Sequence, residues 1–170
     1  VLNSIRKFTT NIWKITNLGE DKTKVLHNFS WLPSLNIKTE KEMASLIVDQ
    51  WINNYSNYSD KYWSLDIVTM RLIYWISSYE IIFKNNDLIF RSKVINNIVK
   101  QTKHLFKNIN LVNSGVDKIK SLSALILVGN SFEQYEEYTQ FGLKNLESEL
   151  SDFISKDGFV KSKNPEDLFW

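Results

Sequence analysis

Apolar residues recur at steps of three and four through most of the chain, which is the spacing of one face of an α-helix. Polar stretches separate these segments from one another. Only five Gly and two Pro occur among 170 residues, too few for the tight turns of an all-β protein. The pattern therefore predicts an all-α fold. Its helical segments are expected over residues 22–35, 39–54, 65–83, 88–106, 114–129 and 131–153.

Paired capping residues mark three of the predicted helix starts. In such a pair a hydroxyl or carboxylate accepts a hydrogen bond from a backbone amide that the helix itself leaves unsatisfied. The first segment is expected to be short and broken, because Pro33 interrupts it. The pairs are Thr39 with Glu42, Ser114 with Asp117, and Ser131 with Gln134.

Helices of this length, joined by short loops, pack antiparallel to their neighbours in sequence. No motif recurs at the fixed period of tetratricopeptide or ankyrin repeats. We therefore expect serial antiparallel helical hairpins with no sheet beyond two short strands, and the pattern leaves open whether they form a solenoid or a toroid. Six residues on the apolar stripes are expected to be buried: Trp51, Leu72, Trp75, Ile98, Leu125 and Leu146.

Composition excludes several classes of function. The formal net charge is only +2 and no run of Lys and Arg is dense enough to follow a phosphate backbone, so nucleic acid is not an expected partner. The absence of Cys excludes disulfides and cysteine metal sites, and no motif indicates a cofactor or another metal site. No stretch of 18 apolar residues occurs, so no membrane span is predicted. These properties fit a soluble protein, either cytoplasmic or exported.

The two ends of the chain differ from its helical middle. Residues 1–6 carry neither an initiator Met nor a signal-peptide pattern, and residues 168–170 are apolar. We therefore expect a piece of a longer protein, with an N-terminal extension over residues 1–21, a helical domain over 22–154 and a tail over 155–170. The tail is expected to pack only partly and to lead to a missing C-terminal portion.

Three stretches carry motifs in a fixed order. Residues 26–32 read Leu-His-Asn-Phe-Ser-Trp-Leu, and residues 63–76 begin with Trp and end in Arg-Leu-Ile-Tyr-Trp-Ile, with Arg71 and Trp75 in that run. Residues 142–165 contain Leu-Glu-Ser-Glu-Leu, followed by Asp-Gly-Phe-Val-Lys-Ser-Lys-Asn-Pro. The motifs, their order and their separation resemble the helical N-terminal region of bacterial heparinase II/III family proteins, from about residue 25 to the end of the chain.

The resemblance implies a fold and a reaction. The fold is an incomplete α/α toroid, normally followed by more helices and by a large β-sandwich that would be a further partner of this chain. The reaction is β-elimination on an anionic polysaccharide that contains uronic acid. Such a site needs a group to neutralise the uronate carboxylate, a base such as Tyr or His for the neighbouring proton, and an acid for the leaving oxygen.

The same resemblance shows where this chain departs from the family's lyases. They carry an Asn-His pair that meets the uronate at the start of the fifth helix, where this chain has Val116 and Asp117. Val cannot donate a hydrogen bond, and Asp would repel a carboxylate. In the tail, Phe159 and Val160 replace Gly and His, and Lys163 replaces Arg. Lys keeps the positive charge but cannot make the two parallel hydrogen bonds by which an arginine holds a carboxylate. No catalytic residue is therefore predicted, and the chain alone is expected to lack lyase activity.

Six residues are candidates for contacts to an anionic sugar: His27, Trp31, Tyr62, Trp63, Arg71 and Lys163. A lone His on an apolar stripe is more often part of the core. A half-buried Arg such as Arg71 usually has a carboxylate partner, here Asp66 or Glu80. Most of the tryptophans are expected to anchor helix packing, while Tyr62 and Trp63, at a loop–helix junction, are the better platforms for a sugar ring.

Two functions remain open from the sequence. One is the helical domain of a heparinase II/III-like polysaccharide lyase that binds or cleaves uronic-acid-containing polysaccharide. The other is a non-catalytic helical module that binds a protein or a carbohydrate. Val116 and Asp117, at the position of the family's Asn-His pair, favour the second, non-catalytic function.

Overall fold

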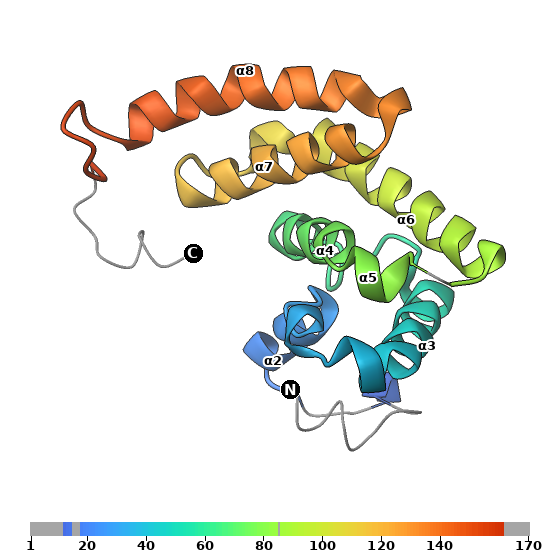
Figure 1. Ribbon diagram of the computed structural model, residues 1–170. Helices are drawn as coiled ribbons and strands as arrows, with labels where there is room; N and C mark the ends of the chain where they lie inside the picture. Colours follow the sequence, from blue (N-terminus) through green and yellow to red (C-terminus); the bar gives the residue numbers. More distant parts are fainter. Residues whose placement is uncertain (1–11, 15–17, 85, 162–170) are drawn as a thin grey trace. The chain divides into compact units, whose positions relative to one another are not determined.

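The computed structural model describes residues 12–14, 18–84 and 86–161, and these residues form seven α-helices and no β-strand (Figure 1). The α-helices are α2 (Glu20–His27), α3 (Ile37–Tyr55), α4 (Leu65–Ser77), α5 (Tyr79–Ile82), α6 (Leu88–Lys107), α7 (Val116–Ser131) and α8 (Glu136–Phe153). Short 3-10 helices are η1 (Ile12–Lys14), η2 (Leu32–Ser34), η3 (Ile109–Leu111) and η4 (Glu133–Tyr135). The all-α prediction is confirmed. Among the described helices, none combines the length and the apolar character that crossing a membrane requires.

The start of α3 differs from the predicted capping box at Thr39 and Glu42. The N-cap residue is Asn36, whose side chain accepts a hydrogen bond from the Lys38 amide at 3.0 Å. In return, the Glu40 carboxylate accepts one from the Asn36 amide at 2.7 Å. This reciprocal pair satisfies two amides three residues earlier than predicted, so the helix begins at Ile37.

The predicted capping box at Ser131 and Gln134 is also wrong. Ser131 is the last residue of α7, and its hydroxyl donates to the Leu127 carbonyl at 2.7 Å, as Ser does inside a helix. The chain then passes through η4, and α8 begins at Glu136. The segment predicted as one helix over residues 65–83 is divided at Ser78 into α4 and α5.

The chain divides into two compact units, residues 1–101 and residues 102–170, with the boundary inside α6. The predicted extension over residues 1–21 contains η1, which packs within the first unit. Ile12 is buried, and the Trp13 indole donates to the Ile47 carbonyl of α3 at 3.2 Å. The last helix residue before the predicted tail is Phe153, as expected from the apolar stripe.

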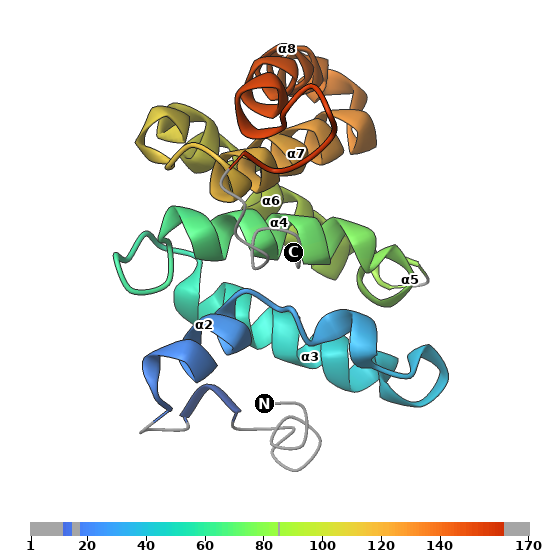
Figure 2. The same cartoon turned by 90° about the vertical axis from the view of Figure 1, so that its left-hand side faces the viewer.

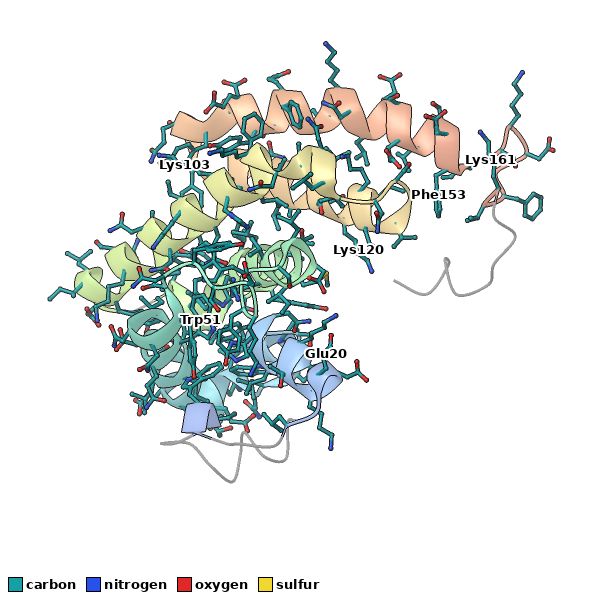
Figure 3. The ribbon with its side chains drawn as sticks, turned by 180° about the vertical axis from the view of Figure 1, so that it is seen from behind. Glu20, Trp51, Lys103, Lys120, Phe153 and Lys161 are labelled. Carbon is teal, nitrogen blue, oxygen red and sulfur yellow. The ribbon has the colours of Figure 1, made fainter. Side chains whose placement is uncertain are left out.

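Rings from separate segments form the core of the first unit. Trp51 of α3 and Trp75 of α4 meet edge to face at 5.5 Å between ring centres, and Phe29 meets Trp75 at 5.3 Å. All three side chains are completely buried, and each such contact adds about 1 kcal/mol beyond simple burial. Figure 2 shows α3 and α4 running in opposite directions, and Figure 3 shows Trp51 among the densely packed side chains.

In the second unit α7 and α8 lie side by side and run in opposite directions (Figure 1). The buried residues of α8 are Tyr138, Thr139 and Gly142, all in its first half. Leu146, predicted to be buried, is therefore only half-buried, whereas the other five predicted core residues are buried. After α8, an antiparallel bridge pairs Ile154 with Val160 around a tight turn.

The described part of the predicted tail ends at residue 161. Phe159, in the turn, is 74% exposed, and Gly158 has φ of 82°, a conformation that suits glycine. The Lys161 amide donates to the Phe153 carbonyl at 2.9 Å, which holds the turn against the end of α8. The expected exposure of Phe169 and Trp170 concerns positions outside the described residues.

Candidate functional site

Arg71 of α4 is completely buried and joins three segments of the first unit. Its Nε donates to Gln101 Oε1 at 2.6 Å. Its Nη1 donates to the carbonyl of His27, at the end of α2, at 2.9 Å, and to the carbonyl of Tyr62, in the loop before α4, at 3.1 Å. We call His27, Trp51, Tyr62, Arg71 and Gln101 the Arg71 cluster.

The predicted ion pair of Arg71 with Asp66 or Glu80 is wrong. Asp66 pairs with Lys24 at 3.6 Å, and Glu80 pairs with Lys84 at 2.8 Å. Instead of a carboxylate, three neutral oxygens and the face of Trp51, whose ring centre lies 4.1 Å from Cζ, stabilise the guanidinium. Burial lowers the pKa of Arg71, yet a guanidinium stays protonated at neutral pH.

His27 lies at the centre of the Arg71 cluster, and its side chain is buried. Its Nδ1 accepts a hydrogen bond from the Trp51 indole at 3.1 Å, and its ring stacks on Tyr62 with ring centres 4.1 Å apart. Burial, and then the charges of Arg71 and Lys61, lower the pKa of His27 to about 3. The imidazole is therefore neutral at physiological pH and is part of the core.

Two of the aromatic candidates, Trp31 and Trp63, offer no open platform for a sugar. Trp31 and Trp63 are 4% and 2% exposed, and their indoles donate to the backbone carbonyls of Leu26 and Tyr55. Trp63 is therefore a packing anchor, because a ring without an exposed face cannot stack on a ligand. One face of Tyr62 is covered by His27.

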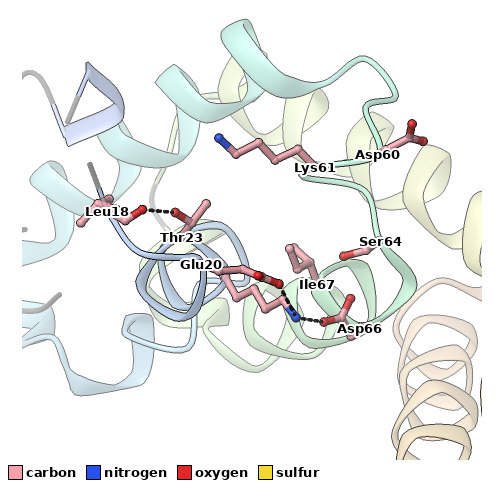
Figure 4. Close-up of a pocket in the computed structure, with 9 residues that line it drawn as sticks. Leu18, Glu20, Thr23, Asp60, Lys61, Ser64, Asp66 and Ile67 are labelled. Carbon is pink, nitrogen blue, oxygen red and sulfur yellow. Dashed lines mark hydrogen bonds and ion pairs between the residues drawn. The ribbon is translucent and has the colours of Figure 1, made fainter. Parts of the chain in front are cut away.

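A pocket of about 460 Å³ opens beside α2 and the start of α4 (Figure 4). Sequence reasoning did not identify it, because its residues come from two segments that lie far apart in the sequence and share no motif. The lining residues are Leu18, Glu20, Thr23, Lys24, Asp60, Lys61, Ser64, Asp66 and Ile67. The polar side chains can bind a hydroxylated ligand, since carboxylates accept and ammonium groups donate hydrogen bonds.

At the start of α7, in the second unit, the chain supplies its own anion. Glu149 Oε1 accepts hydrogen bonds from the Gly115 amide at 2.5 Å and from the Ser114 hydroxyl. Val116 is half-buried and Asp117 is exposed in the first turn. A carboxylate therefore already occupies the positive end of this helix. Lys163 lies outside the described residues.

Within the described ranges, no three or more His, Asp or Glu side chains come together in a way that could hold a metal ion. Of the predicted contact residues, the structure brings His27, Tyr62, Trp63 and Arg71 together. Three of them are buried, and Tyr62 is half-buried. Comparison of the chain with protein-family models, with curated proteins and with solved structures finds no match.

Proposed function

We propose that this chain is the helical region of a heparinase II/III-like protein and binds uronic-acid-containing polysaccharide without cleaving it. The observation that carries this proposal is the Arg71 cluster. His27 belongs to the first of the resembling motifs and Arg71 to the second, 44 positions later, and the two are joined by a 2.9 Å hydrogen bond. The residues that carry the resemblance thus act together in one core.

Arg71 fixes the end of α2 to the loop before α4, and these two segments also border the pocket. An arrangement of serial hairpins as an incomplete α/α toroid, completed by a C-terminal β-sandwich, is part of this proposal. In that arrangement the described helices supply a sugar-binding surface, and the remainder of the protein supplies any further contacts.

Two observations support binding without cleavage. Glu149 holds the amide of Gly115, where a lyase would need groups that attract a uronate carboxylate. The buried His27 is neutral and already accepts a hydrogen bond from Trp51, so it is a poor candidate for the base.

The proposal is tested with a panel of polysaccharides in native gels. We expect the chain to be retarded by gels that contain heparan sulfate or alginate and not by gels that contain neutral dextran. In solution, the ultraviolet absorbance of the unsaturated uronate product should not rise above that of a protein-free control. Equal migration in all gels, or clear product formation, would contradict the proposal.

A further inference from the structure

Most charged groups of the pocket are already paired within the protein. Lys24 of α2 lies 3.4 Å from the Glu20 carboxylate and 3.6 Å from that of Asp66. Burial alone would raise the pKa of Asp66, but hydrogen bonds from Ser64 and from the Ile67 amide, with the charge of Lys24, lower it. Asp66 is therefore ionised and engaged with its neighbours.

The other two charged side chains of the pocket are those of Asp60 and Lys61. The Asp60 carboxylate accepts a hydrogen bond from the Tyr58 hydroxyl at 2.6 Å. Lys61 is exposed, and among the described residues no carboxylate lies within ion-pair distance of its ammonium group, which stands 5.3 Å from the centre of the Tyr62 ring. Of the two ammonium groups in the pocket, Lys61 is thus the one that has no ion pair with a described carboxylate.

The charge balance of the pocket selects among anions. Its lining has three carboxylates, Glu20, Asp60 and Asp66, against two ammonium groups, Lys24 and Lys61. Such a lining repels a dianion such as a phosphate ester about twice as strongly as a monoanion, because the repulsion grows with the charge of the ligand. A ligand with a single carboxylate on a hydroxylated ring fits better. Its carboxylate can pair with the Lys61 ammonium group, while the pocket carboxylates accept hydrogen bonds from the ring hydroxyls.

We infer that this pocket is a subsite for one uronate residue of the polysaccharide, with the Lys61 ammonium group as the contact to the uronate carboxylate. The choice of uronate rests on the proposed function. The volume of about 460 Å³ accommodates a single sugar ring with its substituents. Leu18 and Ile67, the apolar part of the lining, suit the face of a sugar ring, and Thr23 and Glu20 carry oxygens that suit its hydroxyls.

The subsite is tested by nuclear magnetic resonance titration with methyl glucuronide and with methyl glucoside, which lacks the carboxylate. We expect amide shifts in residues 18–24 and 60–67, and weaker binding of the glucoside. Lys61→Gln should weaken glucuronide binding about tenfold, since it removes one charge-assisted hydrogen bond, and should leave glucoside binding unchanged. Lys22→Gln removes the same charge from an exposed position of α2 outside the pocket and should change neither.

Equal glucuronide affinity in Lys61→Gln and Lys22→Gln, or shifts confined to other parts of the chain, would overturn the subsite. Gel retardation of the same variants separates this outcome from failure of the proposed function. If heparan sulfate or alginate retards the chain but Lys61→Gln behaves as wild type, the subsite is wrong and the function stands. If no polymer retards the chain while glucuronide binding depends on Lys61, the subsite stands and the function is wrong.

Discussion

At Arg71 the edge of a guanidinium meets the carboxamide of Gln101. Arg71 Nε donates to Gln101 Oε1. The second nitrogen on that edge of the guanidinium is Nη2, and the nitrogen of the carboxamide is Nε2. Both are buried donors without a hydrogen-bond partner among the described residues. Two donors cannot bond to each other, so half of this contact is unsatisfied. A carboxylate would accept from both nitrogens of the guanidinium edge.

We therefore predict opposite effects for two substitutions at Gln101. Gln101→Glu should raise the free energy of unfolding at neutral pH by about 1 kcal/mol. The added carboxylate pairs with the positive charge of Arg71, which is buried in the wild-type protein as well. Gln101→Met, of similar volume, should lower the free energy of unfolding by about 2 kcal/mol, because Arg71 Nε loses its acceptor. Urea unfolding measures both, with the exposed Gln134→Glu as control. A loss of stability in Gln101→Glu as large as in Gln101→Met would contradict this account.

His27 makes stability depend on pH in the acidic range. The unfolded chain takes up a proton near the ordinary pKa of 6.5, whereas the folded chain does so only near pH 3. The unfolded state thus binds more protons between these values, and stability falls as pH falls. Between about pH 6 and pH 4, wild type should lose about 1.4 kcal/mol per pH unit more than His27→Gln. Parallel pH profiles of the two proteins would show that His27 is not the group responsible.

Single residues were predictable only in part. The burial of Arg71 follows from its apolar neighbours in the sequence, and that of His27 from its place on an apolar stripe. The partner of Arg71 did not follow, because Gln101 lies 30 positions away and only the packing of the helices brings it close. Nothing in the local sequence distinguishes this amide from a surface glutamine.

Two glycines control the contact between helices α7 and α8. A Cβ at Gly129 would lie 2.7 Å from the Thr139 amide nitrogen and 2.9 Å from the Tyr135 carbonyl oxygen, both backbone atoms. A Cβ at Gly142 would lie 2.5 Å from a side-chain carbon of Ile126. The glycines therefore allow the two backbones to approach more closely than any other residue would.

We predict that Gly129→Ala lowers the free energy of unfolding by about 2 kcal/mol, although alanine is the better helix former by about 1 kcal/mol. Gly142→Ala should have a smaller effect, because the Ile126 side chain can move. Gly19→Ala, where a Cβ would meet nothing within 4 Å, serves as the control. Denaturant unfolding gives the comparison. A Gly129→Ala protein as stable as wild type would mean that the helices pack less closely than described.

At the level of elements, the apolar stripes predicted the spans of the helices well and their caps poorly. The stripe over residues 88–106 became α6, because burial along a whole face outweighs any single residue. Capping depends on one or two hydrogen bonds, and several polar residues near each end compete for them. At the start of α3, Asn36 and Glu40 took this role from the pair at Thr39 and Glu42.

For the whole molecule, the sequence predicted the fold class but not the pocket. The pocket is built from residues 18–24 and 60–67, which are separated by all of α3. Neither segment alone indicates a pocket, and only the packing of α2 against α4 brings Lys61 to the same pocket as Thr23 and Lys24. Side-chain placement of this kind carries no periodic signal in the sequence.

The central claim is that the chain binds a uronic-acid polymer and leaves it intact. Calorimetric titration with heparan sulfate and with its carboxyl-reduced form, followed by chromatography of the recovered polymer, tests it most directly. We predict saturable binding to the native polymer that weakens as salt is added, markedly weaker binding to the reduced form, and an unchanged chain length. Equal affinity for both forms, no binding, or a shortened polymer with unsaturated ends would contradict the account.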